Sequence, residues 1–311
     1  MERGKSLSVG IIGSGALGSY FGMRLAESGQ EVSFLLRSDF AAVKEEGMVL
    51  TLAEGERIVL KRPRIVRKPE EMGRQEMVLI GLKTTRNALF GELLEPVVGP
   101  GTILVTVQNG LGNVEALEAR FPKNPVVGAL CQIGVNREGP GRIRNFVPGN
   151  GFVQIGAHPG SPGEAEVETC LEVFEGAGIR TRRTASLGEA LWRKLMWNVP
   201  FNGLTVTIGG KGTDAVCEDP ELRTVAIELM EEIRLAANAL GYAIEPEYGD
   251  KLMGFTDKLG AYQSSTVLDW HEGRPLEVEA IFRKPLQAGL EAGVSMPRLE
   301  QLVKDLEECS G

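Results

Sequence analysis

Short runs of consecutive apolar residues alternate with amphipathic stretches in the first half of the chain. Such uninterrupted runs are typical of parallel strands that are covered on both faces. They predict strands over residues 7–12, 31–36, 77–82, 102–107 and 125–130. Between the first two, residues 16–28 carry apolar side chains at helical spacing and are followed by Gly29. This pattern predicts a helix, and with it a strand–helix–strand unit.

The composition changes between residues 139 and 163, where Gly, Pro and Asn are frequent. Two short β-rich runs within this stretch, residues 142–146 and 151–156, predict a hairpin at the edge of the sheet. We expect this hairpin to close the first domain. Residues 1–185 are then expected to form a Rossmann-type α/β domain with a mostly parallel sheet.

From about Ser186 onward the apolar spacing is helical throughout. It predicts helices over residues 187–208, 220–240, 246–262, 276–293 and 297–308. The second of these has the clearest ends, because Asp219 and Pro220 form an N-cap and a first helical position, and Gly241 is a stop signal. Residues 186–311 are expected to form an all-α domain, with a ligand cleft between the two domains.

The composition is that of an ordinary globular protein, and it narrows the range of partners. The chain has 311 residues, 42% hydrophobic and 24% charged, and 34 Lys and Arg against 42 Asp and Glu give a net charge of −8. Sequence-independent binding to nucleic acid needs clustered positive charge. The one basic run, residues 61–68, is better explained as the solvated face of a strand. We therefore expect no nucleic-acid partner.

Neither a membrane span nor a secretion signal is indicated. No apolar window approaches the roughly 18 residues that a spanning helix needs. The first apolar run stops at Gly13 without a small-residue cleavage site. Four widely separated cysteines, Cys131, Cys170, Cys217 and Cys309, predict neither a disulfide framework nor a zinc site. We expect a cytoplasmic protein without a metal.

A glycine-rich turn follows the first predicted strand and opens the first predicted helix. Its residues follow the pattern G-x-G-x-x-G and are Gly13, Ser14, Gly15, Ala16, Leu17 and Gly18. In this setting Gly13 permits the tight turn, Gly15 leaves room for a pyrophosphate, and Gly18 lets helix and strand approach. The free amides at the helix start favour phosphate charge. The pattern predicts a dinucleotide site, and a glycine-rich turn without a ligand is the alternative.

The end of the second predicted strand distinguishes between the two nicotinamide dinucleotides. An NAD site has an acid there, about 20 residues past the loop, to bind the ribose 2′-hydroxyl. This chain has Arg37 at that place, and a guanidinium matches a 2′-phosphate bidentately. The residues therefore favour NADPH/NADP as the cofactor. In the alternative explanation, Arg37 is a surface residue paired with Asp39.

A polar stripe in the helical half is the candidate catalytic feature. Lys194, Asn198 and Asn202 follow one another at i, i+4 and i+8, and so lie on one face of the predicted helix. Their neighbours are apolar, which favours partial burial, and a solvated surface stripe is the alternative. Pro200 removes a backbone hydrogen bond in this segment and predicts a kink or break in the helix.

Further polar candidates lie near the C-terminus. Glu277 and Glu279 open the next predicted helix, and two acids in a first turn are explained well by the helix dipole alone. The two histidines, His158 and His271, lie in no recognisable acid–base setting. A reductase would then need a lysine as its proton donor, which suits a group whose pKa a partly buried cleft can lower.

In their order and spacing, these motifs resemble the ketopantoate reductase family (2-dehydropantoate 2-reductase) along essentially the whole chain. The matching residues are the loop 13–18, Arg37, Lys83 in Leu82-Lys83-Thr84, Asn109-Gly110 with Gly112, Leu191-Trp192-Arg193-Lys194 with Asn198 and Asn202, and Ser264-Ser265, Asp269, Glu277 and Glu279. The resemblance implies NADPH-dependent reduction of 2-dehydropantoate to (R)-pantoate, a step towards pantothenate and coenzyme A. It also suggests a homodimer.

The resemblance further implies a role for each matching residue. Lys194 would donate a proton to the carbonyl oxygen, and Glu277 would bind substrate and tune the lysine. The residues that would hold the substrate are Asn198, Asn202 and Ser265, while Asn109 and Lys83 would lie near the nicotinamide and the substrate. Three residues depart from the family pattern and affect the shape of the substrate pocket: Gln108, Trp197 and Pro200.

Three other functions are compatible with the same motifs. The first is NADPH-dependent reduction of another branched 2-oxo acid, because a pocket can change without disturbing these residues. The second is a non-catalytic NADP(H)-binding redox sensor, against which Lys194 and Asn198 argue. The third is a dehydrogenase of the 3-hydroxyacid or glycerol-phosphate kind, and residues 191–194 favour the ketopantoate reductase family over it.

Overall fold

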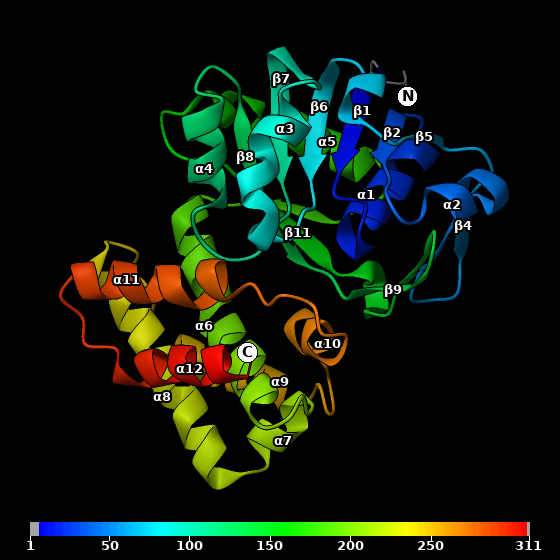
Figure 1. The fold of residues 1–311 in the computed structure, drawn as a ribbon. Helices are drawn as coiled ribbons and strands as arrows, with labels where there is room; N and C mark the ends of the chain where they lie inside the picture. The colour runs from blue at the N-terminus through cyan, green and yellow to red at the C-terminus, as the bar shows by residue number, and fades with distance from the viewer. Residues whose placement is uncertain (1–5, 310–311) are drawn as a thin grey trace. The chain divides into compact units, whose positions relative to one another are not determined.

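The computed structural model describes residues 6–309 and divides the chain into two compact units (Figure 1). Of the described residues, the first unit comprises 6–108 and 113–187, and the second comprises 109–112 and 188–309. The charged residues Glu2, Arg3 and Lys5 lie outside the described part. The short segment 109–112 is the notable feature of this division, because the chain enters the second unit there and returns to the first.

An eight-stranded sheet forms the centre of the first unit. Its strands are β1 (Ser8–Ile12), β2 (Glu31–Leu35), β5 (Arg64–Val66), β6 (Gln75–Ile80), β7 (Val98–Thr106), β8 (Val126–Gln132), β11 (Phe152–Gly156) and β12 (Thr181–Arg183), in the order β12-β11-β8-β7-β6-β1-β2-β5. All neighbours are parallel except β11 and β8. The mostly parallel sheet and the five strands expected from apolar runs are confirmed.

A second sheet, which the apolar pattern does not predict, has four strands. Its order is β4 (Arg57–Leu60), β3 (Met48–Thr51), β10 (Arg142–Asn145) and β9 (Val135–Gly139). Helix α1 (Ala16–Glu27) packs on β1 and β2 of the large sheet and also on all four strands of the small one. Its apolar side chains, including the fully buried Phe21, thus join the two sheets in one core.

The expected edge hairpin of residues 142–146 and 151–156 is wrong. β10 pairs with β9, across a turn in which Gly141 has a φ of +65°, whereas β11 lies between β8 and β12 in the large sheet. The chain turns between the two strands at Gly149 and Asn150, which both have positive φ. Glycine and asparagine accept this conformation more readily than other residues, so the turn redirects the chain instead of closing a hairpin.

The basic run at residues 61–68 agrees with the solvated interpretation. Its basic side chains are all exposed, and Val66 is buried in the edge strand β5. Only residues 64–66 of the run form the strand. The remaining helices of the first unit are α2 (Phe40–Glu46), α3 (Phe90–Leu94), α4 (Asn113–Arg120) and α5 (Val167–Gly176), with short 3-10 turns η1 (Pro69–Glu71), η2 (Thr84–Leu89), η3 (Pro148–Asn150) and η4 (Pro162–Glu166).

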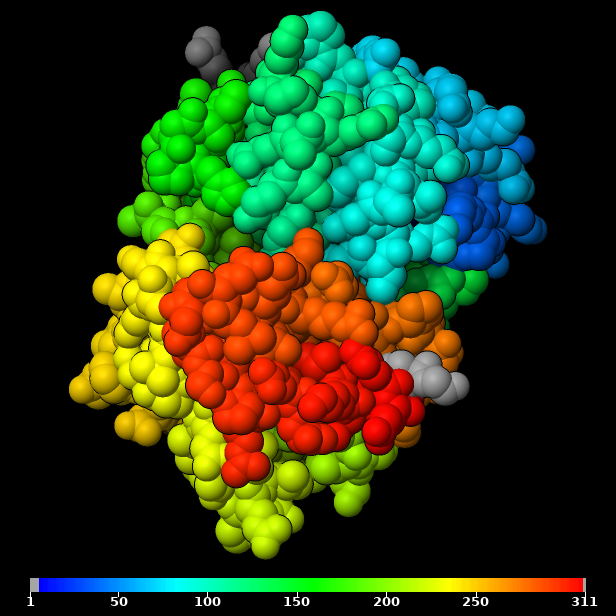
Figure 2. Space-filling view, turned by 60° about the vertical axis from the view of Figure 1, so that its left-hand side comes forward, coloured from blue at the N-terminus to red at the C-terminus, as the bar shows by residue number. Residues whose placement is uncertain are grey.

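The second unit is all-helical, as predicted. Its helices are α6 (Leu187–Thr207), α7 (Thr213–Cys217), α8 (Pro220–Ala239), α9 (Glu247–Thr256), α10 (Ser265–His271), the π-helical turn η5 (Glu279–Arg283), α11 (Lys284–Glu291) and α12 (Pro297–Glu308). α8 packs on α11 and α12, which lie side by side on the surface (Figure 2). Within residues 6–309, no helix has both the length and the apolar character to cross a membrane.

Several helix ends differ from the prediction. α8 has the expected N-cap, because Asp219 Oδ1 accepts hydrogen bonds from the N–H groups of Glu221 and Leu222 at 2.9 and 3.1 Å. The helix expected at 246–262 ends at Thr256, and the one expected at 276–293 begins as the π-helical turn at Glu279. The short helices α7 and α10 were not predicted, because two turns carry too little periodicity to detect.

Of the kink or break predicted at Pro200, the break is wrong, since α6 continues through Pro200 to Thr207. The residues on either side, Val199 and Phe201, are fully buried in the core of the second unit. Trp197 also packs in this core, where its Nε1–H donates to Thr256 Oγ1 at 2.9 Å. Tertiary packing of this kind offsets the hydrogen bond that proline removes.

Candidate functional site

The glycine-rich turn connects β1 to α1, and two of its glycines are required by close packing. Gly13 has a φ of +97°, and a Cβ there would lie closer than 3.0 Å to the backbone of Leu82. A Cβ on Gly18 would lie equally close to the carbonyl oxygen of Gly13. A Cβ on Gly15, in contrast, would meet no atom within 4 Å. The turn is therefore closely packed at Gly13 and Gly18 and open at Gly15, as a bound pyrophosphate requires.

The start of α1 leaves its positive end available to an anion. Gly15 is the N-cap, no side chain caps the helix, and the first turn, which begins with Ala16 and Leu17, has no acidic residue. Ser14 points elsewhere, because its Oγ donates to the Leu35 carbonyl at 3.0 Å. Backbone N–H groups at such a helix start bind phosphate oxygens well. The residues of the loop thus fit the pyrophosphate of a dinucleotide.

The bond from Ser14 to Leu35 ties the glycine loop to the end of β2, two residues before Arg37. Arg37 is exposed, whereas Asp39 is buried. The carboxylate of Asp39 accepts hydrogen bonds from Arg137 Nε and Nη2 at 3.1 and 2.5 Å. The alternative explanation, in which Arg37 pairs with Asp39, is therefore wrong. Asp39 turns inward to the β9–β10 hairpin and leaves the end of β2 to Arg37.

The ion pair of Asp39 and Arg137 predicts a pH-dependent contribution to stability. Burial by itself would raise the pKa of Asp39, but hydrogen bonds from Arg137, Ser38 and Gly141 outweigh it and lower that pKa. The charged carboxylate therefore stabilises the fold above the ordinary Asp pKa of about 3.9, and this contribution is lost as the pH falls through the lower native value.

We expect Asp39→Asn to reduce the free energy of unfolding at pH 7 by about 1 to 2 kcal/mol. Urea unfolding of both proteins at a series of pH values measures the difference. The gap between the unfolding free energies of wild type and variant should narrow below about pH 4, where Asp39 takes up its proton in the unfolded chain while the native carboxylate is still charged. A gap that stays constant down to pH 3 would contradict a role for the charge.

Gln108, which departs from the family pattern, belongs to a chain of amide groups. Its Nε2 donates to the Leu82 carbonyl at 2.9 Å and to Asn87 Oδ1 at 2.7 Å, and its Oε1 accepts from Thr106 Oγ1 at 3.0 Å. These bonds join the ends of β6 and β7 and hold the turn on which Lys83 lies, half-buried, at the N-cap of η2. Sequence reasoning missed this network, because no local pattern links Gln108 to Asn87.

The candidate proton donor lies in the second unit together with one predicted partner. Lys194, half-buried on α6, donates from Nζ to Asn109 Oδ1 at 2.7 Å. The two residues are 85 positions apart in the sequence. Asn109 belongs to the segment 109–112, which is assigned to the helical unit although it follows β7 along the chain. The structure thus brings together a lysine and an amide that the sequence singled out separately.

The polar stripe of α6 is buried rather than solvated. Asn198 is 6% exposed and Asn202 is 3% exposed, because α6 packs on the core of the second unit through residues such as Leu195. Asn202 Oδ1 is fully buried and has no hydrogen-bond partner among the described residues. An unsatisfied buried acceptor costs about 1 to 3 kcal/mol, so a ligand that donates a hydrogen bond there would recover that energy.

The two acids near the start of η5 differ in their surroundings. Glu277 is 5% exposed and its carbonyl accepts the N–H of Ile281, whereas Glu279 is exposed and lies 3.7 Å from Arg283. The helix dipole is a sufficient explanation for the exposed Glu279. The side chain of Glu277 is buried, and burying a carboxylate away from water costs more than the dipole at a helix start returns. Ser265 is exposed at the start of α10, where the neighbouring Ser264 accepts the capping hydrogen bond.

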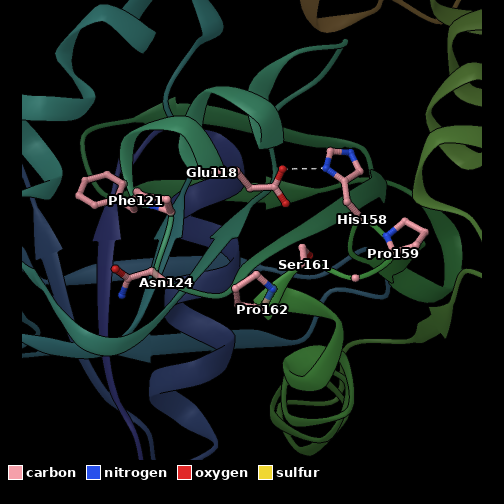
Figure 3. Close-up of a pocket in the computed structure, with 9 residues that line it drawn as sticks. Glu118, Phe121, Asn124, His158, Pro159, Ser161 and Pro162 are labelled. Atoms are coloured by element: carbon pink, nitrogen blue, oxygen red, sulfur yellow. Dashed lines mark hydrogen bonds and ion pairs between the residues drawn. The ribbon is translucent and has the colours of Figure 1, made fainter.

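His158 has a setting that the sequence did not indicate. Its Nδ1 lies 2.9 Å from Glu118 Oε2 and its Nε2 lies 3.7 Å from Glu115, beside a cavity of about 400 Å³ that Ser161 and Pro162 help to line (Figure 3). The expectation of no acid–base setting is therefore wrong for His158. The cavity lies next to the start of β8, at the amino-terminal ends of the parallel strands, whereas the glycine loop follows the carboxyl-terminal end of β1. It is therefore not part of the dinucleotide site.

No group of three or more His, Cys, Asp or Glu within residues 6–309 could hold a metal ion. All four cysteines are free thiols. His271 contacts a backbone carbonyl, with Nε2 2.9 Å from the oxygen of Gly210.

A glycine turn at the carboxyl end of a parallel strand, on a chain that continues into an all-helical unit, defines a two-domain protein with a dinucleotide-binding unit of the Rossmann type. Residues 9–160 match the family described as ketopantoate reductase PanE/ApbA, and residues 187–308 match the ketopantoate reductase PanE/ApbA C terminal. The chain belongs to the ketopantoate reductase family.

Individual relatives agree with this assignment. A 2-dehydropantoate 2-reductase of Nostoc sp. is 33% identical over 97% of this chain and 94% of its own length. The crystal structure of 2-dehydropantoate 2-reductase from Geobacter metallireducens GS-15 is 38% identical, has a TM-score of 0.92, and is matched over 97% of this chain and 99% of its own. D-Mandelate dehydrogenase, solved with NADH and anilino(oxo)acetate, shares the fold with a TM-score of 0.85 at 19% identity, over 97% of this chain and 98% of its own.

These comparisons define the chemistry at the level of the family. The chain is an oxidoreductase that acts on CH–OH groups, and its family uses NAD(P)H and small-molecule keto acids. The oxidoreductase activity, the Rossmann-type first domain and the all-helical second domain predicted from the sequence are confirmed.

Proposed function

We propose that this protein reduces 2-dehydropantoate to (R)-pantoate with NADPH. The observation that supports this most directly is the hydrogen bond from Lys194 Nζ to Asn109 Oδ1 at 2.7 Å. It gives the helical unit a half-buried ammonium group, held by an amide, next to a buried polar stripe. Relatives named 2-dehydropantoate 2-reductase match the chain over nearly its whole length, which favours this substrate among the keto acids.

The cofactor would be held by the first unit. The backbone of residues 13–18 would bind the pyrophosphate, and Arg37 would bind the 2′-phosphate that distinguishes NADPH from NADH. The exposure of Arg37, together with the inward turn of Asp39, supports this role. Lys83 would lie near the nicotinamide. NADPH supplies the hydride when it is bound. Because D-mandelate dehydrogenase, which shares the fold, was solved with NADH, the affinities of this protein for NADPH and NADH are to be compared directly.

The residues of the helical unit would complete the reduction. As C2 of the keto acid takes up a hydride, negative charge grows on its carbonyl oxygen and needs a cation or proton there. Lys194 supplies both, since its ammonium group stabilises the oxyanion and then donates the proton that makes the hydroxyl group. Asn109 would orient the ammonium group, and Glu277 would bind the substrate and tune the lysine.

Substrate binding would use the remaining polar residues. The buried Oδ1 of Asn202 would accept a hydrogen bond from a hydroxyl group of the substrate, which its lack of a protein partner supports. Asn198, one turn earlier on α6, and Ser265 at the start of α10 would provide further contacts. A pocket with a buried polar group discriminates strongly against substrates that leave this group unpaired.

We expect Glu277→Ala to raise the KM for 2-dehydropantoate and to lower kcat, each by about tenfold, because a lost hydrogen bond to a charged group costs about 1.5 to 3 kcal/mol in total. Steady-state kinetics at saturating NADPH measure both constants. Glu279→Ala is a matched control, since this exposed acid lies two residues further on and should leave both constants within about twofold. Unchanged kinetics for Glu277→Ala would mean that Glu277 serves only the start of its helix and has no role in the reaction.

The proposed function is tested by mixing the purified protein with NADPH and a panel of 2-oxo acids. Loss of absorbance at the nicotinamide band should be fastest, by kcat/KM, with 2-dehydropantoate. A faster reaction with another branched 2-oxo acid would replace the proposed substrate. NADPH binding without turnover on any of them would favour a redox sensor. The homodimer and the cytoplasmic location stay predictions.

A further inference from the structure

The segment 109–112, which carries Asn109, is held to the helical unit by its backbone. The N–H of Leu111 donates to the carbonyl oxygen of Ala280 at 2.9 Å, and Ala280 is buried in the π-helical turn η5. The same segment places Asn109 Oδ1 on Lys194 Nζ. This backbone hydrogen bond therefore ties to η5 the part of the chain that positions the candidate proton donor.

The Ala280 carbonyl is available because η5 departs from α-helical geometry. In an α-helix it would accept the N–H of Lys284, four residues on, but that N–H donates to the Glu279 carbonyl instead. In a π-helix it would accept from residue 285, which is Pro285 and has no N–H. Both helical donors are thus removed, and Leu111 takes the vacant place. π-Helical turns are rare and frequently occur at functional sites.

Two glycines let the segment approach this turn. Gly110 and Gly112 have φ values of +80° and +81°. A Cβ on Gly110 would lie closer than 3.0 Å to the carbonyl oxygen of Ala280, which is backbone and cannot move aside. A Cβ on Gly112 would lie as close to the Lys284 ammonium group, which is the end of a flexible side chain and can move. The two positions share a backbone strain but differ in what an added methyl group would displace.

We propose that η5 and Pro285 form a positioning device for the reaction. Because neither Lys284 nor Pro285 donates a hydrogen bond to the Ala280 carbonyl, this oxygen accepts from the N–H of Leu111. Gly110 permits the close approach of the two segments. The segment then holds the Asn109 amide on the Lys194 ammonium group. The consequence for catalysis rests on the proposed function, whereas the consequence for Lys194 itself does not. Gly110, Ala280 and Pro285 are positioning residues, since they act through Asn109.

Chemical labelling of Lys194 tests the proposal without any turnover. Full-length protein is treated with acetic anhydride at fixed pH, and the rate at Lys194 is quantified by mass spectrometry of its peptide. Gly110→Ala should raise this rate at least about threefold, because the amine loses a hydrogen bond to Asn109. Gly112→Ala is the matched control and should label at the wild-type rate. Equal rates in wild type and both variants would overturn the proposal.

Pro285→Ala is a second variant in case Gly110→Ala does not fold. It returns an N–H that competes with Leu111 for the Ala280 carbonyl, and it should also raise the labelling rate at Lys194. A double-mutant cycle then separates positioning from general damage: Gly110→Ala should lower kcat by about tenfold in wild type but have little further effect on Asn109→Ala. Full additivity of the two losses would contradict action through Asn109.

The two proposals fail separately. If the wild-type protein does not reduce 2-dehydropantoate, while Gly110→Ala still raises labelling at Lys194 and Gly112→Ala does not, the proposed function is wrong and the positioning device stands. If turnover is found but labelling is the same in all variants, including Pro285→Ala, the positioning device is wrong and the proposed function stands.

Discussion

Lys194→Ala is expected to lower kcat for 2-dehydropantoate by about 10² to 10⁴, the range that a positioned general acid contributes. The alanine can neither stabilise the growing oxyanion nor donate the proton. The affinity for NADPH should change much less, because the loop and arginine assigned to the cofactor belong to the other unit. Stopped-flow or steady-state rates, together with a fluorescence titration of NADPH, measure the two effects separately.

Lys251→Ala is the matched control for that experiment. Lys251 lies on α9 with its side chain 67% exposed, so its removal takes the same charge from the helical unit at a solvated position. Its kcat should stay within about twofold of wild type. A loss of less than about threefold for Lys194→Ala would refute the assignment of the proton donor, since general acids contribute far more.

Arg37→Ala is expected to weaken NADPH binding by about 1.5 to 3 kcal/mol, or roughly 10- to 150-fold in Kd, and to leave NADH binding nearly unchanged. The reason is that the guanidinium would meet only the 2′-phosphate, which NADH lacks. Titration of intrinsic or cofactor fluorescence with each dinucleotide gives both dissociation constants. The ratio of the two constants, rather than either alone, reports on Arg37.

The control for Arg37 is Arg62→Ala, which removes the same charge from an exposed position in the basic run. It should change the two constants little and by the same factor, because long-range screening acts on both dinucleotides alike. Equal weakening of NADPH and NADH by Arg37→Ala would mean that Arg37 does not distinguish the cofactors.

Local signals were sufficient for the parts of the fold that depend on neighbouring residues. The apolar runs predict the parallel strands because both faces of such a sheet are covered. The glycine loop is recognisable because Gly13 turns the chain with a positive φ and Gly18 packs on the Gly13 carbonyl, both within a single strand–turn–helix unit. The long helix α8 is bounded by its own cap residues.

Features that depend on pairs far apart in the sequence could not be predicted in the same way. Asp39 and Arg137 are 98 positions apart, and nothing near either residue indicates that they meet. The small sheet joins β3 to β10, so an expectation based on adjacent strands placed β10 in a hairpin with β11. The π-helical turn depends on Pro285 and on the distant Leu111 together, and periodicity alone predicts an ordinary helix there.

The candidate site shows the same division. The stripe of Lys194, Asn198 and Asn202 follows from helical spacing on one element, and its burial agrees with the apolar neighbours. The contact of Lys194 with Asn109 lies beyond local spacing, because it depends on the way segment 109–112 joins the helical unit. The resemblance to the family supplied both residues, but not their contact.

Transfer of an isotopic label from cofactor to product tests the central claim most directly. The wild-type protein is incubated with 2-dehydropantoate and NADPH that carries deuterium on the transferable position of C4, and the pantoate is examined by NMR and mass spectrometry. Deuterium at C2 of (R)-pantoate, with a rate of transfer that falls by about 10² to 10⁴ in Lys194→Ala, is the predicted result. Unlabelled pantoate, or bound NADPH that never yields its deuterium, would contradict it.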